Sequence, residues 1–384
     1  MFAGLALRLL AAITGDWTMR TDELFQYLEQ AHRIVFGYGQ IPWEFQFGER
    51  TWLLPMLSVP PLWLCKVLGF DSPEQYAPVV RSFHAAFSML IPIGMYFFTR
   101  RAHSETAARC ALVLGCFWHE LVITAPHPIA ESSSSVFVFA ALAVIMAAKM
   151  TTERAIACGF LLGMAFVLRI QYAPTIGLIG LALLFYADNR GRIALVGAGI
   201  LAVLIAGLVD YLYWGRFWNT YINHFNLQLF SDFNKYIHQA LRNVHLHNLF
   251  IGSVGLYYVV AFAALFYYRR LWFFIALVLS VHLIHNIVAN KEYVNTFLAI
   301  PFLLLMAAGL MAQWGTSGAR NALIAGKDKA IALLAAFMLT TIAGFGVWLP
   351  DNKNCLYFST IKCCFTAIPL LPLTWRCPKN RRKK

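Results

Sequence analysis

Residues 193–212, IALVGAGILAVLIAGLVDYL, form an uninterrupted apolar run in which Asp210 is the one charged residue. A helix of about twenty apolar residues crosses a hydrocarbon core about 30 Å thick. In the whole chain of 384 residues, 60% are hydrophobic and 13% are charged, and the mean hydropathy is +0.62. A water-soluble core cannot bury that much apolar surface, so the composition indicates a membrane protein with many spans.

Further apolar segments of this kind follow one another with short connections. They predict an all-α polytopic protein: a transmembrane domain over residues 1–349, with about eleven spans, and a short tail over 350–384. The predicted spans are Phe2–Thr14, Val79–Phe98, Ala108–Ala125, Val136–Ala148, Ala155–Leu168, Pro174–Tyr186, Ile193–Leu212, Leu249–Tyr268, Leu271–Val288, Val294–Ala312 and Ala330–Leu349.

The segment Trp52–Phe70 is also apolar but contains Pro55, Pro60 and Pro61. Because proline removes a helical hydrogen bond, we expect a re-entrant or interfacial hairpin that does not cross the membrane. Most arginines and lysines then fall in connections on one side, which the positive-inside rule makes the cytoplasm. The first connection, 15–78, and a second, 213–248, lie on the other side, together with the tail.

The formal net charge of +13 does not indicate a nucleic-acid partner, because the basic residues stand mostly in pairs in short membrane connections. Topology and anionic lipid headgroups account for such pairs. The sequence contains neither a nucleotide-binding glycine loop nor a metal-binding cluster, so no cofactor is expected.

The first connection contains the long polar stretch MRTDELFQYLEQAHRIVFGYGQIPWEFQFGERTWLLP, residues 19–55. Apolar residues recur in it at helical spacing from Leu24 to Val35, so the sequence predicts an amphipathic helix on the membrane surface that begins at Asp22. Asp22 and Glu23 therefore lie in its first turn, just beyond the first span. Acidic residues there also serve for capping alone, and the two interpretations are equally weighted on this pattern.

Other ionisable residues fall at the outer ends of different spans, where they are costly in lipid and usually face a cavity and one another. They are Arg81, His84, His127, Glu131, Arg169, Asp210, Arg216, His282, His285, Lys291 and Glu292. Together with Asp22 they predict a polar pocket at the membrane boundary that contains both acids and bases. Such a pocket suits a substrate with a polar reactive end and a lipid tail, for example a sugar attached to a polyprenyl phosphate.

The stretch DELFQYLEQAHRIVFGYGQIPWEFQFGERTWLLP, residues 22–55, resembles the first lumenal loop of the mannosyltransferases that use dolichyl-phosphate-mannose to build glycosylphosphatidylinositol anchors and lipid-linked oligosaccharides. The matching positions are Asp22, Glu23, Gln26, Glu29, His32, Tyr38, Gly39, Trp43, Glu44, Arg50 and Pro55. DYLYWGRFWNTYINHFN, residues 210–226, and NKEYVNTFLAIPFLLL, residues 290–305, resemble two further segments of that family more weakly. Arg20, Thr21 and Asn290 depart from its pattern.

The resemblance implies a GT-C-like fold and an inverting transfer of mannose from a polyprenyl-phosphate donor to a lipid-linked glycan or glycolipid acceptor. The active site would face the lumen of the endoplasmic reticulum or the outside of a bacterial cytoplasmic membrane. Combined with the predicted pocket, it makes Asp22 the general base, with Glu23 positioning the acceptor or assisting. Lys291 and Arg50 would bind the donor phosphate. The wider set of expected substrate-binding residues is Glu292, Gln26, Glu29, His32, Trp43, Glu44, Arg81, His127, Arg169 and Asp210.

Two alternatives remain open on the sequence. The same charges could line the translocation path of a lipid or solute transporter or flippase. The chain could also be a family member that binds substrate without catalysis, given its changed residues at Arg20, Thr21 and Asn290.

Overall fold

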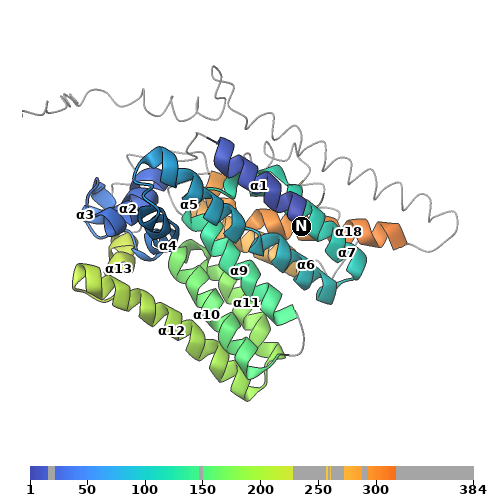
Figure 1. The fold of residues 1–384 in the computed structure, drawn as a ribbon. Helices are drawn as coiled ribbons and strands as arrows, with labels where there is room; N and C mark the ends of the chain where they lie inside the picture. Colours follow the sequence, from blue (N-terminus) through green and yellow to red (C-terminus); the bar gives the residue numbers. More distant parts are fainter. Residues whose placement is uncertain are drawn as a thin grey trace, which may run out of the picture.

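The computed structural model describes residues 1–15, 22–146, 150–227, 257, 260, 272–287 and 293–316, and the regular elements in these ranges are all helical (Figure 1). Their bounds are α1 Phe2–Thr14, η1 Glu23–Leu28, α2 Glu29–Phe36, α3 Trp43–Gln46, α4 Leu53–Val67, α5 Pro73–Phe87, α6 Leu90–Ala102, α7 Glu105–Phe117, α8 His119–Thr124, α9 Ala130–Met146, α10 Thr152–Leu168, η2 Ile170–Tyr172, α11 Ala173–Tyr186, α12 Asn189–Trp214, α13 Asn219–Phe225, α17 Trp272–Ile287, η5 Tyr293–Thr296 and α18 Ala299–Thr316.

The predicted all-α class is confirmed, and each predicted span within the described ranges coincides with one helix or with two consecutive helices. The predicted spans 249–268 and 330–349 and the tail 350–384 lie outside these ranges, apart from the helical residues Tyr257 and Val260. By length and composition, two helical segments of the described part could cross a membrane, 73–102 and 189–214, so the predicted number of spans remains a prediction.

Polar residues begin several of the long helices. Ser104, Thr151 and Asp188 accept a hydrogen bond from the third backbone N–H of α7, α10 and α12, respectively. Ser72 begins α5 in a capping box with Gln75. These side chains use donors that the first turn of a helix leaves without an intrahelical partner, and so they fix where each apolar segment starts.

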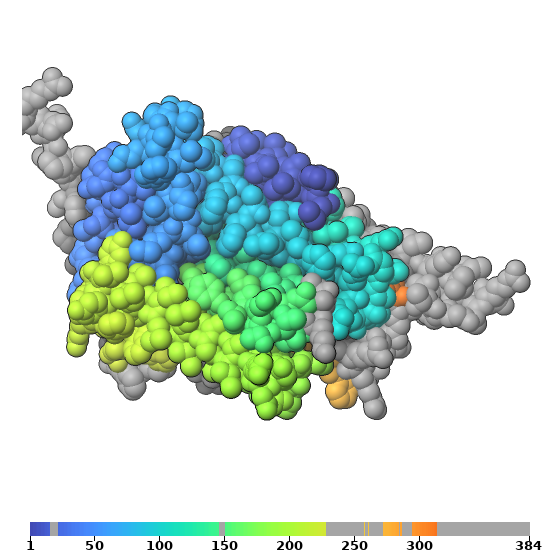
Figure 2. Space-filling view, turned by 60° about the horizontal axis from the view of Figure 1, so that its bottom comes forward, coloured from blue at the N-terminus to red at the C-terminus, as the bar shows by residue number. Residues whose placement is uncertain are grey.

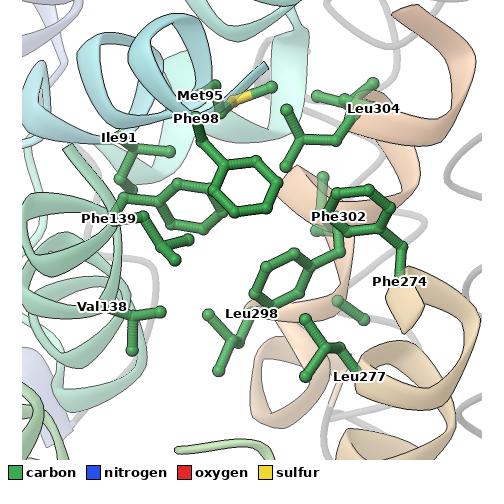
Figure 3. Close-up of a cluster of buried hydrophobic side chains, with 14 of the residues drawn as sticks. Ile91, Met95, Phe98, Val138, Phe139, Phe274, Leu277, Leu298, Phe302 and Leu304 are labelled. Atoms are coloured by element: carbon green, nitrogen blue, oxygen red, sulfur yellow. The ribbon is translucent and has the colours of Figure 1, made fainter. Parts of the chain in front are cut away.

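The main hydrophobic core lies between α6, α9, α17 and α18 (Figure 3). The rings of Phe139 on α9 and Phe302 on α18 lie 5.2 Å apart, and those of Phe98 on α6 and Phe274 on α17 lie 5.4 Å apart. Met95 is completely buried beside them. Because α17 and α18 come from a distant part of the chain, this core fixes the position of η5, which immediately precedes α18.

Glycines bring α10 and α12 into close contact. A Cβ atom added at Gly159 would clash with the carbonyl oxygen of Leu195, and one added at Gly163 would lie 2.7 Å from Cβ of Ala202. Residue 159 thus lies beside residue 195, and residue 163 lies beside residues 199 and 202, so α10 and α12 run parallel in direct contact. In the chain, α11 connects them, and Figure 1 shows α10 between α12 and α11. Small residues at four-residue spacing allow such backbone contact between helices.

The end of α7 is held by a buried arginine from α1. Arg8 is 1% exposed and donates to the carbonyl oxygens of Gly115, at 2.7 Å, and Cys116, at 2.6 Å. The last carbonyls of a helix lack intrahelical donors, and α7 ends at Phe117 before α8 begins. Arg8 therefore anchors the first helix to this break by satisfying these acceptors.

The expected hairpin over residues 52–70 is wrong, because α4 is one continuous helix from Leu53 to Val67. Pro60 and Pro61 remove two helical donors, and Pro55 lies in the first turn, where no intrahelical bond is lost. Packing compensates for the missing bonds, since Leu62 and Cys65 are completely buried in a cluster with residues of α2 and α5.

The short helix α13 docks on the first connection. Asp210, near the end of α12, accepts hydrogen bonds from the backbone N–H of Thr220, at 2.8 Å, and from its hydroxyl, at 2.9 Å. Asn223 then donates to the carbonyl oxygen of Phe47 at 2.9 Å, and His224 lies 3.2 Å from the Glu49 carboxylate. Figure 1 shows α13 beside α3 and α4, and in Figure 2 the blue surface of the first connection meets the yellow-green surface of α12 and α13.

The contact between α10 and α12 predicts the effect of adding a methyl group at Gly159. Gly159→Ala forces the two backbones apart, and we expect it to lower the free energy of unfolding by about 1–3 kcal/mol. Gly177→Ala is the matched control, because a Cβ atom there meets nothing within 4 Å. Thermal unfolding of the purified proteins in detergent measures both. A Gly159→Ala protein as stable as the control would contradict the close contact.

The docking of α13 predicts a pH dependence. Burial lowers the pKa of the His224 imidazole, an effect that the Glu49 carboxylate only partly offsets. The unfolded chain, with a histidine pKa of about 6.5, therefore binds a proton that the folded protein does not, and stability falls as the pH drops through about 6.5. Thermal unfolding measured between about pH 7.5 and 5.5 should show that His224→Asn loses less stability on acidification than the unchanged protein. Equal losses of stability would contradict this role of the His224 imidazole.

Candidate active site

The predicted amphipathic helix is present, and it begins with a π-helical turn over Glu23–Leu28. A π turn widens the helix and is frequent at functional sites. Asp22 has helical backbone angles and does not cap the turn with its side chain. Its side chain is partly exposed, whereas that of the adjacent Glu23 is 2% exposed. The two carboxylates that the sequence places side by side therefore occupy different environments.

Glu23 points into the protein. Its Oε2 lies 2.8 Å from Nδ1 of His127, which is also buried. His84 on α5 is close enough to experience the charge of both groups, and its Nε2 lies 2.8 Å from the hydroxyl of Ser58 on α4. The hydrogen bond between Glu23 and His127 connects the π turn to the segment before α9, so Glu23 helps to fix the position of the adjacent Asp22.

A cavity opens beside this turn, between the first connection, η2 and α13. Its polar and charged lining residues are Tyr27, Glu49, Arg50, Thr51, Arg169, Gln171, Thr220, Tyr221 and His224. Leu54, Ala130, Val167, Leu168 and Ile170 form its apolar part. The cavity thus has the mixed lining expected for a substrate with a charged end and a lipid tail.

Arg50 interacts electrostatically with several acids of the first connection. Burial by itself would lower the pKa of Arg50, but the ionisable groups of Tyr27, Asp22, Glu49 and Glu44 together raise it above its ordinary value, so the guanidinium stays charged. Its buried Nε has no hydrogen-bond partner among the described residues. A desolvated donor of this kind is costly unless an acceptor binds to it.

Asp22 lies within electrostatic reach of the cavity. Its charge acts on both Arg50 and Tyr27, which line the cavity. Burial, opposed in part by Arg50, raises the pKa of Tyr27 to about 12, so this phenol stays protonated. Asp22 is not one of the lining residues, but its partly exposed carboxylate acts electrostatically on an arginine that is.

A second arginine completes the cationic side of the cavity. Nη2 of Arg169 lies 3.2 Å from Oε1 of Glu131 on α9 and 2.7 Å from Oδ1 of Asn295 in η5. Its Nε has no hydrogen-bond partner among the described residues. Lys291 and Glu292 lie outside the described residues, but Asn295 belongs to the same sequence segment, and Arg169 joins that segment to the cavity.

Four polar side chains connect the elements on another side of the cavity. Nδ1 of His224 lies 3.2 Å from Oε1 of Glu49, and Nε2 of His224 lies 2.9 Å from Nε2 of Gln171 in η2. Tyr221 donates to the carbonyl oxygen of Val167 at 2.9 Å. Sequence reasoning missed Glu49, Gln171 and Tyr221 as site residues; the signal that points to Glu49 is its place next to Arg50 in the stretch 22–55.

The other predicted site residues mostly hold the first connection together. Gln26 donates to Glu44 at 2.6 Å, and Glu29 accepts from the backbone N–H of Gln40 at 2.7 Å. His32 stacks on Phe36, with ring centroids 4.5 Å apart. Burial, partly offset by hydrogen bonding and Arg50, raises the pKa of Glu44.

Three more predicted residues lie apart from the cavity lining. Trp43 is 42% exposed at the start of α3. Arg81 donates to the backbone carbonyl of Gly15, just after α1, and Asp210 holds Thr220 as described above. Within the described ranges, no group of three or more His, Cys, Asp or Glu side chains is placed to hold a metal ion.

The cavity can therefore hold an anion, and it can place a carboxylate near that anion. Two guanidinium groups with unused Nε donors suit a phosphate, which arginine binds through several hydrogen bonds. Asp22 supplies a partly exposed carboxylate that acts electrostatically on Arg50, and a carboxylate can accept a proton. These are the parts that a transfer reaction with a phosphate leaving group requires.

Comparison with solved structures shows a related fold. ArnT from Cupriavidus metallidurans, in a structure bound to undecaprenyl phosphate, superposes with a TM-score of 0.61 over 95% of this chain and 75% of that chain, at 13% sequence identity. At this identity the similarity concerns the fold, which agrees with the predicted GT-C-like architecture.

Sequence relatives are mannosyltransferases. GPI mannosyltransferase 3 of Yarrowia lipolytica is 26% identical over 221 residues, covering 55% of this chain and 42% of the relative. GPI alpha-1,2-mannosyltransferase 3 of Bos taurus is 20% identical over 313 residues, covering 78% of this chain and 56% of the relative. The chain thus spans about half the length of these relatives. The model of one family, described as the Alg9-like mannosyltransferase family, matches residues 1–348. On this match over nearly all of its length, the chain belongs to the Alg9-like mannosyltransferase family.

Proposed function

We propose that the protein transfers mannose from a polyprenyl-phosphate donor to a hydroxyl group of a lipid-linked glycan or glycolipid, with inversion at the anomeric carbon. The observation that carries this proposal is the position of Arg50, a half-buried residue that lines the cavity, whose buried Nε has no hydrogen-bond partner among the described residues and on which the charge of Asp22 acts. Family membership supports the mannosyl group, and the undecaprenyl phosphate in the ArnT structure supports a polyprenyl-phosphate donor.

The donor phosphate binds between Arg50 and Arg169 in this proposal. Both guanidinium groups line the cavity and have an Nε donor without a partner among the described residues. Glu131 and Asn295 hold Arg169 by its Nη2 and thus fix its orientation. The apolar lining, which includes Leu54, receives the first part of the polyprenyl chain. Lys291, from the adjacent segment, is a further candidate for the phosphate.

Asp22 acts as the general base. The acceptor oxygen forms a bond to the anomeric carbon while the bond from that carbon to the phosphate oxygen breaks. The hydroxyl proton moves to the Asp22 carboxylate, and the polyprenyl phosphate leaves with its negative charge beside Arg50 and Arg169. Glu23 does not need to touch either substrate, since its hydrogen bond to His127 holds the turn that carries Asp22.

The proposed site lies on the extracytoplasmic or lumenal side of a membrane. Since α10 and α12 run parallel, Arg154 and Arg192 lie at one end of this helix pair, and Arg169 and Asp210 lie at the other. Arginine-rich connections face the cytoplasm by the positive-inside rule, which supports placing the cavity on the opposite side. The membrane would be that of the endoplasmic reticulum or a bacterial cytoplasmic membrane.

Replacing the proposed base gives the first test. Asp22→Asn keeps the size of the side chain but cannot accept the proton, so we expect the transfer rate to fall by about 10²- to 10⁴-fold. Asp71→Asn, at an exposed position between α4 and α5, is the matched control. The assay follows radiolabelled mannose from a defined polyprenyl-phosphate donor to a lipid-linked acceptor. Near-normal turnover by Asp22→Asn would rule out this base, and a donor that crosses the membrane unmodified would indicate a transporter instead.

Replacing the phosphate-binding arginine gives the second test. Arg50→Ala should weaken binding of bare polyprenyl phosphate by about 10- to 100-fold, since a charged hydrogen bond to the phosphate is lost. Arg50→Lys should recover only part of the affinity, because lysine does not reproduce the guanidinium geometry. Arg101→Ala, at the exposed end of α6, serves as the control. Unchanged affinity in Arg50→Ala would place the phosphate elsewhere.

A further inference from the structure

We propose that Glu49 is a sugar-binding residue, which accepts hydrogen bonds from the hydroxyl groups of a hexosyl ring in the cavity. This inference rests on the proposed function, and it assigns a role to a residue that the chemistry above does not use. Glu49 stands next to Arg50 in the chain, and both side chains line the same cavity.

The geometry of the Glu49 carboxylate points to a missing partner. The side chain is 5% exposed, and its Oε1 lies 3.2 Å from Nδ1 of His224. Its Oε2 is buried and has no hydrogen-bond partner among the described residues. A buried carboxylate oxygen is costly to leave unsatisfied, so the cavity presents a strong acceptor that a ligand can use.

The neighbouring residues hold this acceptor in place. The amide nitrogen of Gln171 is a donor, so Nε2 of His224, 2.9 Å away, must accept. The proton of a neutral imidazole is then on Nδ1 and is donated to Oε1 of Glu49. One oxygen of Glu49 is thus used to fix the side chain, which leaves Oε2 for a ligand.

The chemistry of the cavity selects the ligand. A phosphate would be repelled by Glu49, and Arg50 and Arg169 offer it better partners in the same cavity. A neutral hydroxyl group, by contrast, donates well to a carboxylate. A mannosyl phosphate presents both features in one molecule, since its phosphate suits the arginines and its ring carries adjacent hydroxyls.

The same hydroxyl chemistry could come from the donor ring or from the acceptor glycan, and binding measurements separate the two. The full chain is purified in detergent, and its affinity for polyprenyl-phosphate mannose, bare polyprenyl phosphate and the acceptor lipid is measured without turnover. Glu49→Gln keeps an oxygen for His224 and replaces the other acceptor by an amide donor. We expect it to weaken binding of one of the two sugar-bearing lipids by about 10- to 100-fold. Binding of bare polyprenyl phosphate should not weaken, because the variant removes the negative charge of Glu49 that repels a phosphate.

The affected lipid identifies the source of the ring. Loss of affinity for polyprenyl-phosphate mannose means that Glu49 binds the donor sugar, and loss of affinity for the acceptor lipid means that it binds the acceptor glycan. In each case a set of monodeoxy analogues should contain one that binds the unchanged protein weakly and is insensitive to Glu49→Gln. A residue that only holds the loops together would not produce this coupling to one hydroxyl group.

The matched control is Glu153→Gln, which makes the same chemical change at an exposed position in the first turn of α10, at the end opposite Leu168. Equal affinities of Glu49→Gln and Glu153→Gln for both sugar-bearing lipids would overturn the assignment. A matching loss for bare polyprenyl phosphate would do the same, because it would show a general disturbance of the cavity. Either result leaves the proposed function intact if the protein still transfers mannose. Failure of the unchanged protein to bind any sugar-bearing lipid would instead contradict both the role of Glu49 and the proposed function.

Discussion

A charged group removed from water needs a partner, and this constraint sorts the ionisable residues of the protein by role. Arg8 satisfies the carbonyls at the end of α7, Glu23 is bonded to His127, and Asp210 holds Thr220. The hydrogen bonds of these three groups hold the fold together. Other buried groups retain unused hydrogen-bonding capacity at the cavity, notably Nε of Arg50 and Oε2 of Glu49 among the residues described. A polar substrate in the cavity could accept a hydrogen bond from the arginine and donate one to the carboxylate, and so satisfy both groups.

The cavity depends on contacts between parts of the chain that are far apart in sequence. The close approach of α10 and α12 at Gly159 sets the position of η2 relative to the end of α12. Asp210 then fixes the start of α13, and Asn223 attaches α13 to the first connection. A shift of α10 would therefore move Arg169 with respect to Arg50, which is why a packing contact distant from the cavity matters for the proposed chemistry.

The sequence predicts the helices well because apolar runs of span length carry a strong signal, and α1 coincides with the predicted segment. It also locates the acids of the first turn and Arg50, since they stand in one ordered stretch. It fails at α4, where tertiary packing overrides the effect of two prolines. The sequence could not assign different roles to Asp22 and Glu23, because their difference in burial depends on how the neighbouring helices pack around the turn. Glu49 and Gln171 meet through His224, and no local pattern reveals contacts across 53 and 175 residues.

The central claim is that the cavity binds the phosphate of a lipid-linked sugar between two arginines, with Asp22 beside it. A cryo-electron microscopy structure of the full chain with a non-transferable polyprenyl-phosphate mannose analogue tests it most directly. The account predicts phosphate density within hydrogen-bond distance of the guanidinium groups of Arg50 and Arg169, and the anomeric carbon on the side of Asp22. Phosphate density away from both arginines, or an Asp22 carboxylate separated from the sugar by other protein groups, would contradict it.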